Sequence, residues 1–146
     1  MRMNRLALLL LLAAAAAPAL ASEACMPVAS DGWIRKPPAN LPVMAGYTTL
    51  ENPCDTAVTI VGASTEAFAD TSIHVTRIED GVSRMRVTPA LELPAGATVG
   101  MEPGGLHLML VNPKAPLQLG DAVSIVFALE DGRTLTGEFE LRSTAP

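Results

Sequence analysis

The chain has 146 residues, of which 49% are hydrophobic and 3% aromatic, and its formal net charge is −5. Acidic side chains outnumber basic ones by 15 to 10 without any basic cluster, which argues against nucleic acids and anionic membranes as partners. This length is enough for one domain with a single buried core.

The N-terminal segment predicts export. Arg2 and Arg5 precede an apolar run over residues 6–17, which is followed by Ala19-Leu20-Ala21. This order is typical of a secretory signal peptide cut after Ala21, and the run is shorter than the roughly 20 residues of a membrane helix. We therefore expect a signal peptide over residues 1–21 and one soluble, monomeric, exported domain over residues 22–146, without membrane insertion.

Export also bears on the two cysteines, Cys25 and Cys54, because disulfides persist outside the cytoplasm. A bridge between them would stabilise the fold by roughly 3–4 kcal/mol. A redox-active or metal-binding pair is the alternative, although the C-x-x-C spacing of such pairs is missing. Lipid attachment at Cys25 is a further alternative, which the preceding Ser22-Glu23-Ala24 does not favour.

Short segments of alternating apolar and polar residues follow, bounded by Gly, Pro, Asn and Asp, and they predict an all-β domain. The expected strands are Gly32–Arg35, Ala45–Glu51, Ala57–Ala63, Ser72–Glu79, Val82–Val87, Thr98–Met101, Leu106–Val111, Val123–Glu130 and Thr134–Leu141. Asp80-Gly81 and Asp131-Gly132 are typical of hairpin turns. Seven to nine such strands predict a Greek-key β-sandwich or a barrel.

Both histidines belong to one pattern, His74-x10-Met85-x21-His107-x-Met109. With Asp80-Gly81 as a two-residue turn, Met85 lies opposite Thr76 and shares a face with His74, with Cβ atoms roughly 7–8 Å apart or somewhat less. His107 and Met109 also share a face, because side chains alternate along a strand. The leucines at 106, 108 and 110 then take the core side.

Two imidazoles and two thioethers form a neutral, soft donor set that suits Cu(I) better than zinc, calcium or magnesium. Each residue alone has a simpler explanation, since a lone methionine often fills a core. Met26, Met44 and Met101 could act as auxiliary sulfur ligands, but we expect them to pack in the core. Because imidazole must be unprotonated to bind a metal, copper binding should weaken below about pH 6.

The motif resembles that of the PCuAC family of periplasmic copper chaperones. The similarity includes the segments Asp31-Gly32-Trp33-Ile34-Arg35, Ala45-Gly46-Tyr47, Glu51-Asn52-Pro53, Glu79-Asp80-Gly81-Val82, Leu93-Pro94-Ala95-Gly96 and Pro103-Gly104-Gly105-Leu106-His107-Leu108-Met109-Leu110. The resemblance implies a cupredoxin-like β-sandwich with His74, Met85, His107 and Met109 as Cu(I) ligands. It also implies copper delivery to the copper-accepting domain of cytochrome c oxidase, with a Sco-type assembly protein as a possible collaborator.

Two departures from the family limit this comparison. The chain ends at Ser143-Thr144-Ala145-Pro146 without a His- and Met-rich tail, so a second copper site is not expected. The cysteine pair is not a general part of the motif.

Other functions remain alternatives. Copper storage or detoxification would use the same ligands, and a structural or adhesive β-sandwich would use no metal. A blue-copper carrier needs a cysteine thiolate beside its histidines, which pairing of the cysteines would remove. We do not expect an enzyme, because the sequence shows no catalytic base, no Ser-His-Asp set and no third histidine.

Overall fold

The computed structural model describes residues 24–146, which form ten strands. The expected signal peptide, residues 1–21, lies outside the described residues. The strands are β1 (Val28–Arg35), β2 (Val43–Glu51), β3 (Val58–Ser64), β4 (Phe68–Glu79), β5 (Val82–Val87), β6 (Leu91–Leu93), β7 (Thr98–Gly100), β8 (Leu106–Pro113), β9 (Ala122–Leu129) and β10 (Thr134–Arg142). Within residues 24–146, no helix is long and apolar enough to cross a membrane.

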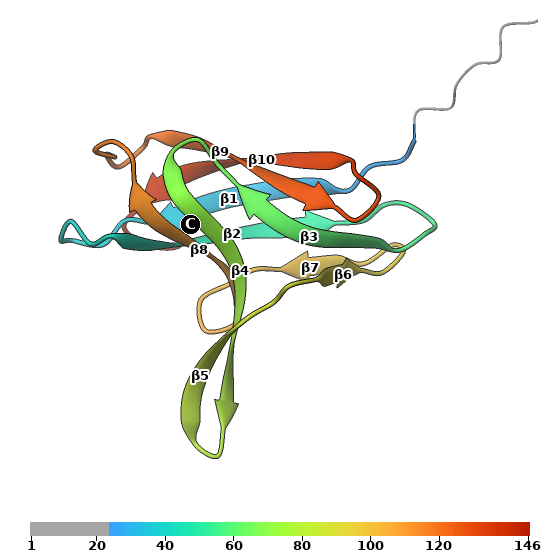
Figure 1. Ribbon diagram of the computed structural model, residues 1–146, viewed down its shortest axis with the longest axis horizontal. Helices are drawn as coiled ribbons and strands as arrows, with labels where there is room; N and C mark the ends of the chain where they lie inside the picture. Colours follow the sequence, from blue (N-terminus) through green and yellow to red (C-terminus); the bar gives the residue numbers. More distant parts are fainter. Residues whose placement is uncertain (1–23) are drawn as a thin grey trace, which may run out of the picture.

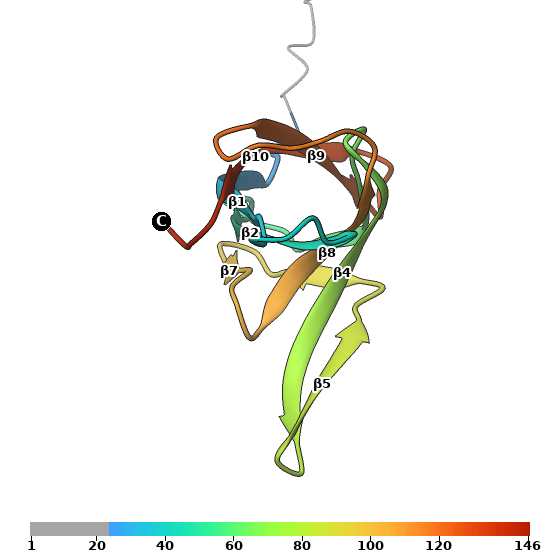
Figure 2. The same cartoon turned by 90° about the vertical axis from the view of Figure 1, so that its left-hand side faces the viewer.

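The strands are hydrogen-bonded in the order β5-β4-β8-β2-β1-β10-β9-β3-β6, and β7 pairs with β2. Strands β1 and β10 run parallel, and the other pairs are antiparallel. The sheet folds over on itself, so that β9 and β10 lie across the core from β2 and β8 (Figure 1 and Figure 2). The all-β prediction is confirmed, and the folded-over sheet forms a β-sandwich, as expected.

Alternation along the strands builds the core. On β9, Val123, Ile125, Phe127 and Leu129 point inward and are at most 4% exposed, whereas the residues between them are more exposed. On β8, Leu108 and Leu110 are fully buried. Period-2 burial of this kind is expected for strands with one face on the core.

Two details differ from the sequence prediction. The described residues contain ten strands rather than seven to nine, because β6 was not expected. Its three residues stand between Pro89 and Pro94, too short a run to show alternation, and form a strand because Leu93 is fully buried and pairs with Val58 on β3. Strands β1 and β4 begin at Val28 and Phe68, each four residues before the expected start.

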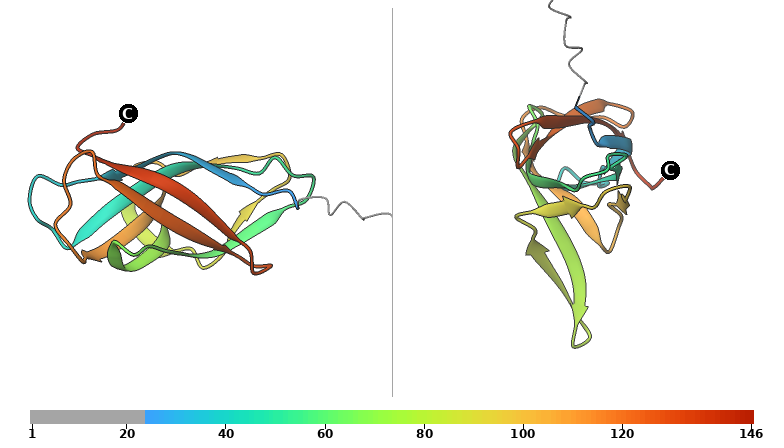
Figure 3. Two further views of the ribbon diagram at one scale, coloured as in Figure 1. Left: turned by 90° about the horizontal axis from the view of Figure 1, so that it is seen from above. Right: turned by 90° about the vertical axis from the view of Figure 1, so that its right-hand side faces the viewer.

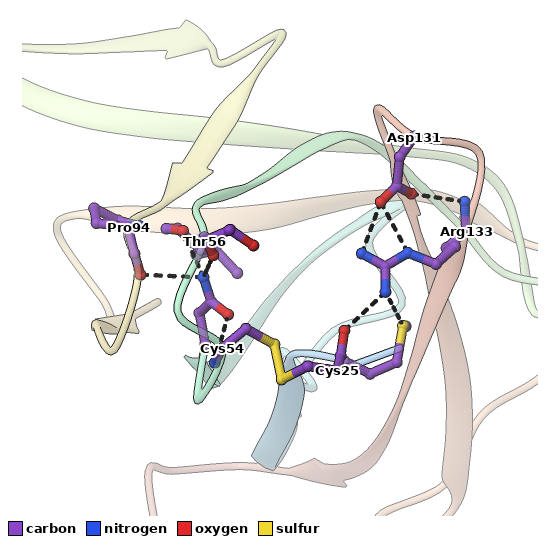
Figure 4. The surroundings of a disulfide bond; sticks show 9 residues. Cys25, Cys54, Thr56, Pro94, Asp131 and Arg133 are labelled. Carbon is purple, nitrogen blue, oxygen red and sulfur yellow. Dashed lines mark hydrogen bonds and ion pairs between the residues drawn. A yellow bond between two sulfur atoms is a disulfide. The ribbon is translucent and has the colours of Figure 1, made fainter. Parts of the chain in front are cut away.

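The predicted disulfide between Cys25 and Cys54 is present, with Cα atoms 5.7 Å apart (Figure 4). Its loop is held by the fully buried Asn52, whose amide Nδ2 donates to the carbonyls of Thr56 and Leu93, both at 2.9 Å. On the other side, Arg133 donates from Nη1 to the carbonyl of Cys25 at 2.8 Å. The N-terminal segment is therefore joined to two separate loops, one of them covalently.

The close packing of β1 on β10 gives a first testable prediction. A Cβ atom at Gly32 would collide with the backbone carbonyl of Glu138, which cannot move without disturbing the β10 ladder. We expect Gly32→Ala to lower the free energy of unfolding by about 1–3 kcal/mol, measured by urea denaturation. Gly62→Ala is the matched control, since a Cβ there meets nothing within 4 Å. Equal destabilisation by both variants would contradict this account.

Candidate metal site

Strand β4 lies between β5 and β8, and its pairing with both places the four candidate ligands on one face. His74 is directly opposite His107 on β8 and Val87 on β5. Thr76 is opposite Met85, and Ser72 is opposite Met109. Residues directly opposite each other project to the same side of a sheet. All four candidate ligands, the two histidines and the two methionines, are therefore on one face. The other face of β8 packs its leucines on the core.

The two imidazoles are neighbours. Their ring centroids are 5.9 Å apart and their planes are inclined by 32°. His107 is buried, with 7% of its surface exposed, whereas His74 is half-buried. Two imidazoles on adjacent strands at this separation are close enough to serve one centre.

The ring of His107 is oriented by the backbone. Its Nδ1 lies 3.0 Å from the carbonyl oxygen of Gly105, and a carbonyl can only accept, so Nδ1 holds the proton. The lone pair is then on Nε2, which is the nitrogen left for a metal. The same carbonyl accepts from the backbone N–H of Thr76 at 3.0 Å, which ties the turn before β8 to β4.

The ring of His74 is held by a side chain instead. Its Nε2 lies 2.9 Å from the hydroxyl Oγ of Ser72, two residues earlier on the same face of β4. Its Nδ1 is buried and has no hydrogen-bond partner among the described residues. A buried polar atom without a partner is costly in a folded protein unless a ligand satisfies it, and such atoms often mark functional sites.

Burial, and secondarily the charge of His107, hold the pKa of His74 below its ordinary value of 6.5, while Asp70 opposes this shift. Because the unfolded chain then binds the proton more readily than the folded one, stability of the metal-free protein should be lost as pH falls from above 6.5 through the lower folded-state pKa. We expect urea midpoints to be lower at pH 5.5 than at pH 7.5, and His74→Gln to reduce this difference. If the urea midpoints of His74→Gln differ between the two pH values as much as those of the wild type, His74 is not the group responsible.

The two methionines differ in exposure. Met109 is half-buried beside β2, opposite Ala45, whereas Met85 is 51% exposed on β5. The β4–β5 hairpin projects from the sandwich, as Figure 1 and the right panel of Figure 3 show. The candidate ligands thus range from a buried imidazole at the sandwich to an exposed thioether on a projecting hairpin.

The donor set fits a soft monovalent cation. No three His, Cys, Asp or Glu side chains gather as a metal-binding group in residues 24–146. The candidate set is instead two neutral imidazoles and two thioethers, the donors that Cu(I) prefers. A surface pocket of about 640 Å³ has lysines and prolines in its wall and is not lined by any of the four.

A family model described as "Putative lipoprotein LpqE-like" matches residues 28–141. The chain belongs to the LpqE-like family. This lipoprotein description agrees with the expected export to the cell envelope. The sulfur of Cys25 is bound in the disulfide and is not available for a lipid.

Two relatives of this LpqE-like chain are similar over part of their length. The putative lipoprotein Lxx21020 of Leifsonia xyli subsp. xyli (strain CTCB07) is 30% identical over 72% of this chain. The uncharacterized protein RP573 of Rickettsia prowazekii (strain Madrid E) is 32% identical over 60% of this chain. The matched regions span 63% and 49% of those proteins.

Solved structures confirm the resemblance to PCuAC domains. The copper-bound PCuAC domain from PmoF2 superimposes with a TM-score of 0.65 at 21% identity, covering 80% of this chain and 92% of that one, which establishes the shared fold. The apo form of DR1885 from Deinococcus radiodurans is 28% identical, covers 97% of each chain and has a TM-score of 0.64. The Cu(I) form of DR1885 is 29% identical, covers 88% and 84%, and has the same TM-score.

The three methionines considered as auxiliary ligands of this LpqE-like chain pack as expected. Met44 and Met101 belong to the buried core, and Met26 packs against it.

The sequence pattern did not identify Ser72 as a partner of His74. Its position two residues before His74, on the same face of β4, was the available signal.

Proposed function

We propose that this chain is a periplasmic Cu(I)-binding metallochaperone with His74, Met85, His107 and Met109 as its ligands. The observation that supports it most directly is the pairing of His74 with His107 across β4 and β8, with both methionines on the same face. The two imidazoles and two thioethers are donors that suit Cu(I). DR1885, which is 29% identical to this chain, has a solved structure in a Cu(I) form, and this also supports the proposal.

The candidate ligands differ in exposure, from the buried His107 to the exposed Met85, and this supports delivery of copper rather than its permanent retention. The backbone-oriented His107 would anchor the ion, while the thioether of Met85 lies in solvent and could be displaced first. Thioethers are weak, neutral ligands, so an acceptor could replace them without a large barrier. We propose the copper-accepting domain of cytochrome c oxidase as recipient, with a Sco-type assembly protein as collaborator.

The decisive experiment is titration of the metal-free protein with Cu(I) against a colorimetric competitor, followed by transfer to the soluble oxidase domain. We expect one equivalent to bind and then to move to the domain. Met85→Leu should weaken binding about tenfold or more, because it removes a ligand while keeping an apolar side chain of similar size. Met101→Leu, a core methionine, is the matched control and should bind copper like the wild type.

Two outcomes would contradict parts of the proposal. Absence of competition at one equivalent would refute copper binding altogether. Tight binding without transfer would leave the ligands in place but refute delivery to the oxidase.

A further inference from the structure

The projecting β4–β5 hairpin exposes apolar side chains beside the candidate metal site. Ile78 is 70% exposed, Val87 is 61% exposed and Met85 is 51% exposed. The register places all three on the face of the hairpin that bears His74, since Val87 is opposite His74, Met85 is opposite Thr76 and Ile78 follows Thr76 by two residues. Clustered exposed apolar side chains are typical of a surface that another molecule covers.

The opposite face of the same hairpin is cationic. Arg77 and Arg84 are directly opposite each other, and Arg86 follows on the same face. Like charges at directly opposed positions destabilise a strand pair, and Glu79 offsets this only in part, by ion pairs to Arg84 at 3.4 Å and to Arg86 at 2.8 Å. A local arrangement that is unfavourable for folding is expected where a function requires it.

This charge contrasts with the rest of the chain. Residues 77–87 contain three arginines and two carboxylates, whereas the remaining residues after position 21 contain five basic and thirteen acidic side chains. The hairpin is therefore a cationic projection from an acidic protein. Opposite charges on two proteins raise their association rate and orient the encounter.

We propose that the β4–β5 hairpin is the docking surface for the copper acceptor, and that the acceptor presents an apolar patch bordered by carboxylates. The apolar patch would cover Ile78, Met85 and Val87 on one face of the hairpin, and the carboxylates at its border would reach around the edge of the two strands to the arginines on the other face. This inference rests on the proposed function. A second copy of the chain fits less well, because a symmetric contact would bring together two hairpins that each carry a net positive charge.

Docking here brings the acceptor's ligands to the exposed end of the site. The bond from Cu(I) to the Met85 sulfur breaks as a bond to the acceptor's first ligand forms, and the remaining ligands follow. The ion stays Cu(I) throughout, so no oxidant or reductant is required. Covering the apolar patch also removes water from the exchanging ligands, so copper need not be released into solution.

The charge component is tested with Arg77→Gln/Arg84→Gln, using the soluble copper-accepting domain of cytochrome c oxidase as probe. We expect Cu(I) transfer to be about tenfold slower at low ionic strength, and the difference to disappear at about 0.5 M salt, where charges are screened. Transfer to a small uncharged chelator should be unchanged. The unfolding midpoint should change little, because the substitution removes the Arg77–Arg84 repulsion together with the exposed ion pair from Arg84 to Glu79, and Glu79 keeps its ion pair with Arg86. A purely structural role of the arginines would lower the midpoint.

The matched control is Lys36→Gln/Lys114→Gln, which removes two positive charges from the wall of the 640 Å³ surface pocket, away from the hairpin. This variant should transfer copper like the wild type. Equal slowing in both variants would show a general charge effect and overturn the docking assignment.

The apolar component is tested with Ile78→Thr/Val87→Thr, which keeps β-branched side chains suited to strands. We expect slower transfer at every salt concentration. Val61→Thr, an exposed valine that is 45% accessible on β3, is the control and should have no effect.

Variants that bind Cu(I) normally and transfer it at the wild-type rate would overturn the docking surface while leaving the proposed function intact. Failure of the wild type to bind Cu(I) would instead refute the proposed function. Sedimentation provides a further check, since a wild-type dimer that either hairpin variant dissociates would assign the surface to self-association and overturn the proposal.

Discussion

His107→Ala is expected to lower the Cu(I) affinity at least about 100-fold, the largest effect of any single substitution at the candidate site. His107 is the most buried of the four candidate ligands, and its ring is already oriented with Nε2 free for a metal. Even the loss of a group that only supports a ligand commonly costs 10–100-fold in metal affinity, and the loss of the ligand itself should cost more.

The measurement is a competition titration with a colorimetric Cu(I) chelator at pH 7.5. Ser72→Ala is the graded comparison, because it removes a hydrogen bond from His74 but no candidate ligand. It should weaken binding by about tenfold, the lower end of the range for a supporting group. Wild-type affinity in His107→Ala would refute the assigned site.

Removal of the disulfide is expected to have the largest effect on stability. Cys25 and Cys54 are 29 positions apart, and closing a loop of that length stabilises a fold by about 3–4 kcal/mol in the chain-entropy model. The double variant Cys25→Ala/Cys54→Ala should therefore unfold at a distinctly lower urea concentration. Its melting temperature should fall by roughly 10–15 °C.

Copper affinity should change little in the same variant, because both cysteines lie outside β4, β5 and β8, the strands that bear the candidate ligands. Arg133 would still hold the N-terminal segment through its hydrogen bond to the carbonyl of residue 25. A double variant as stable as the wild type would show that this hydrogen bond and the core packing are sufficient. A large loss of copper affinity would show that the disulfide supports the site.

The hairpin geometry could be predicted because its determinants are local. Asp80 and Gly81 both adopt positive φ angles, 52° and 75°, as the two-residue turn requires. That turn fixes the whole β4–β5 register, and Thr76 is indeed opposite Met85. Alternation similarly predicted which face of β8 bears His107, because a strand has only two faces.

The pairing of β4 with β8 could not be predicted in the same way. It joins segments separated by β5, β6 and β7, and alternation alone is compatible with many partners and registers. The opposition of His74 and His107 depends on this long-range register. Tertiary packing of Ile73 and Leu108 on the core, rather than any local sequence signal, selects it.

The orientation of the two histidines rests on different kinds of partner, and this difference determines what mutation can change. The acceptor for His107 is a main-chain carbonyl, which every amino acid at position 105 would also provide. The partner of His74 is a hydroxyl, which a single codon change can remove or replace. Substitutions at position 72 would therefore retune the affinity of the proposed copper site, whereas the tautomer of His107 depends on the backbone alone.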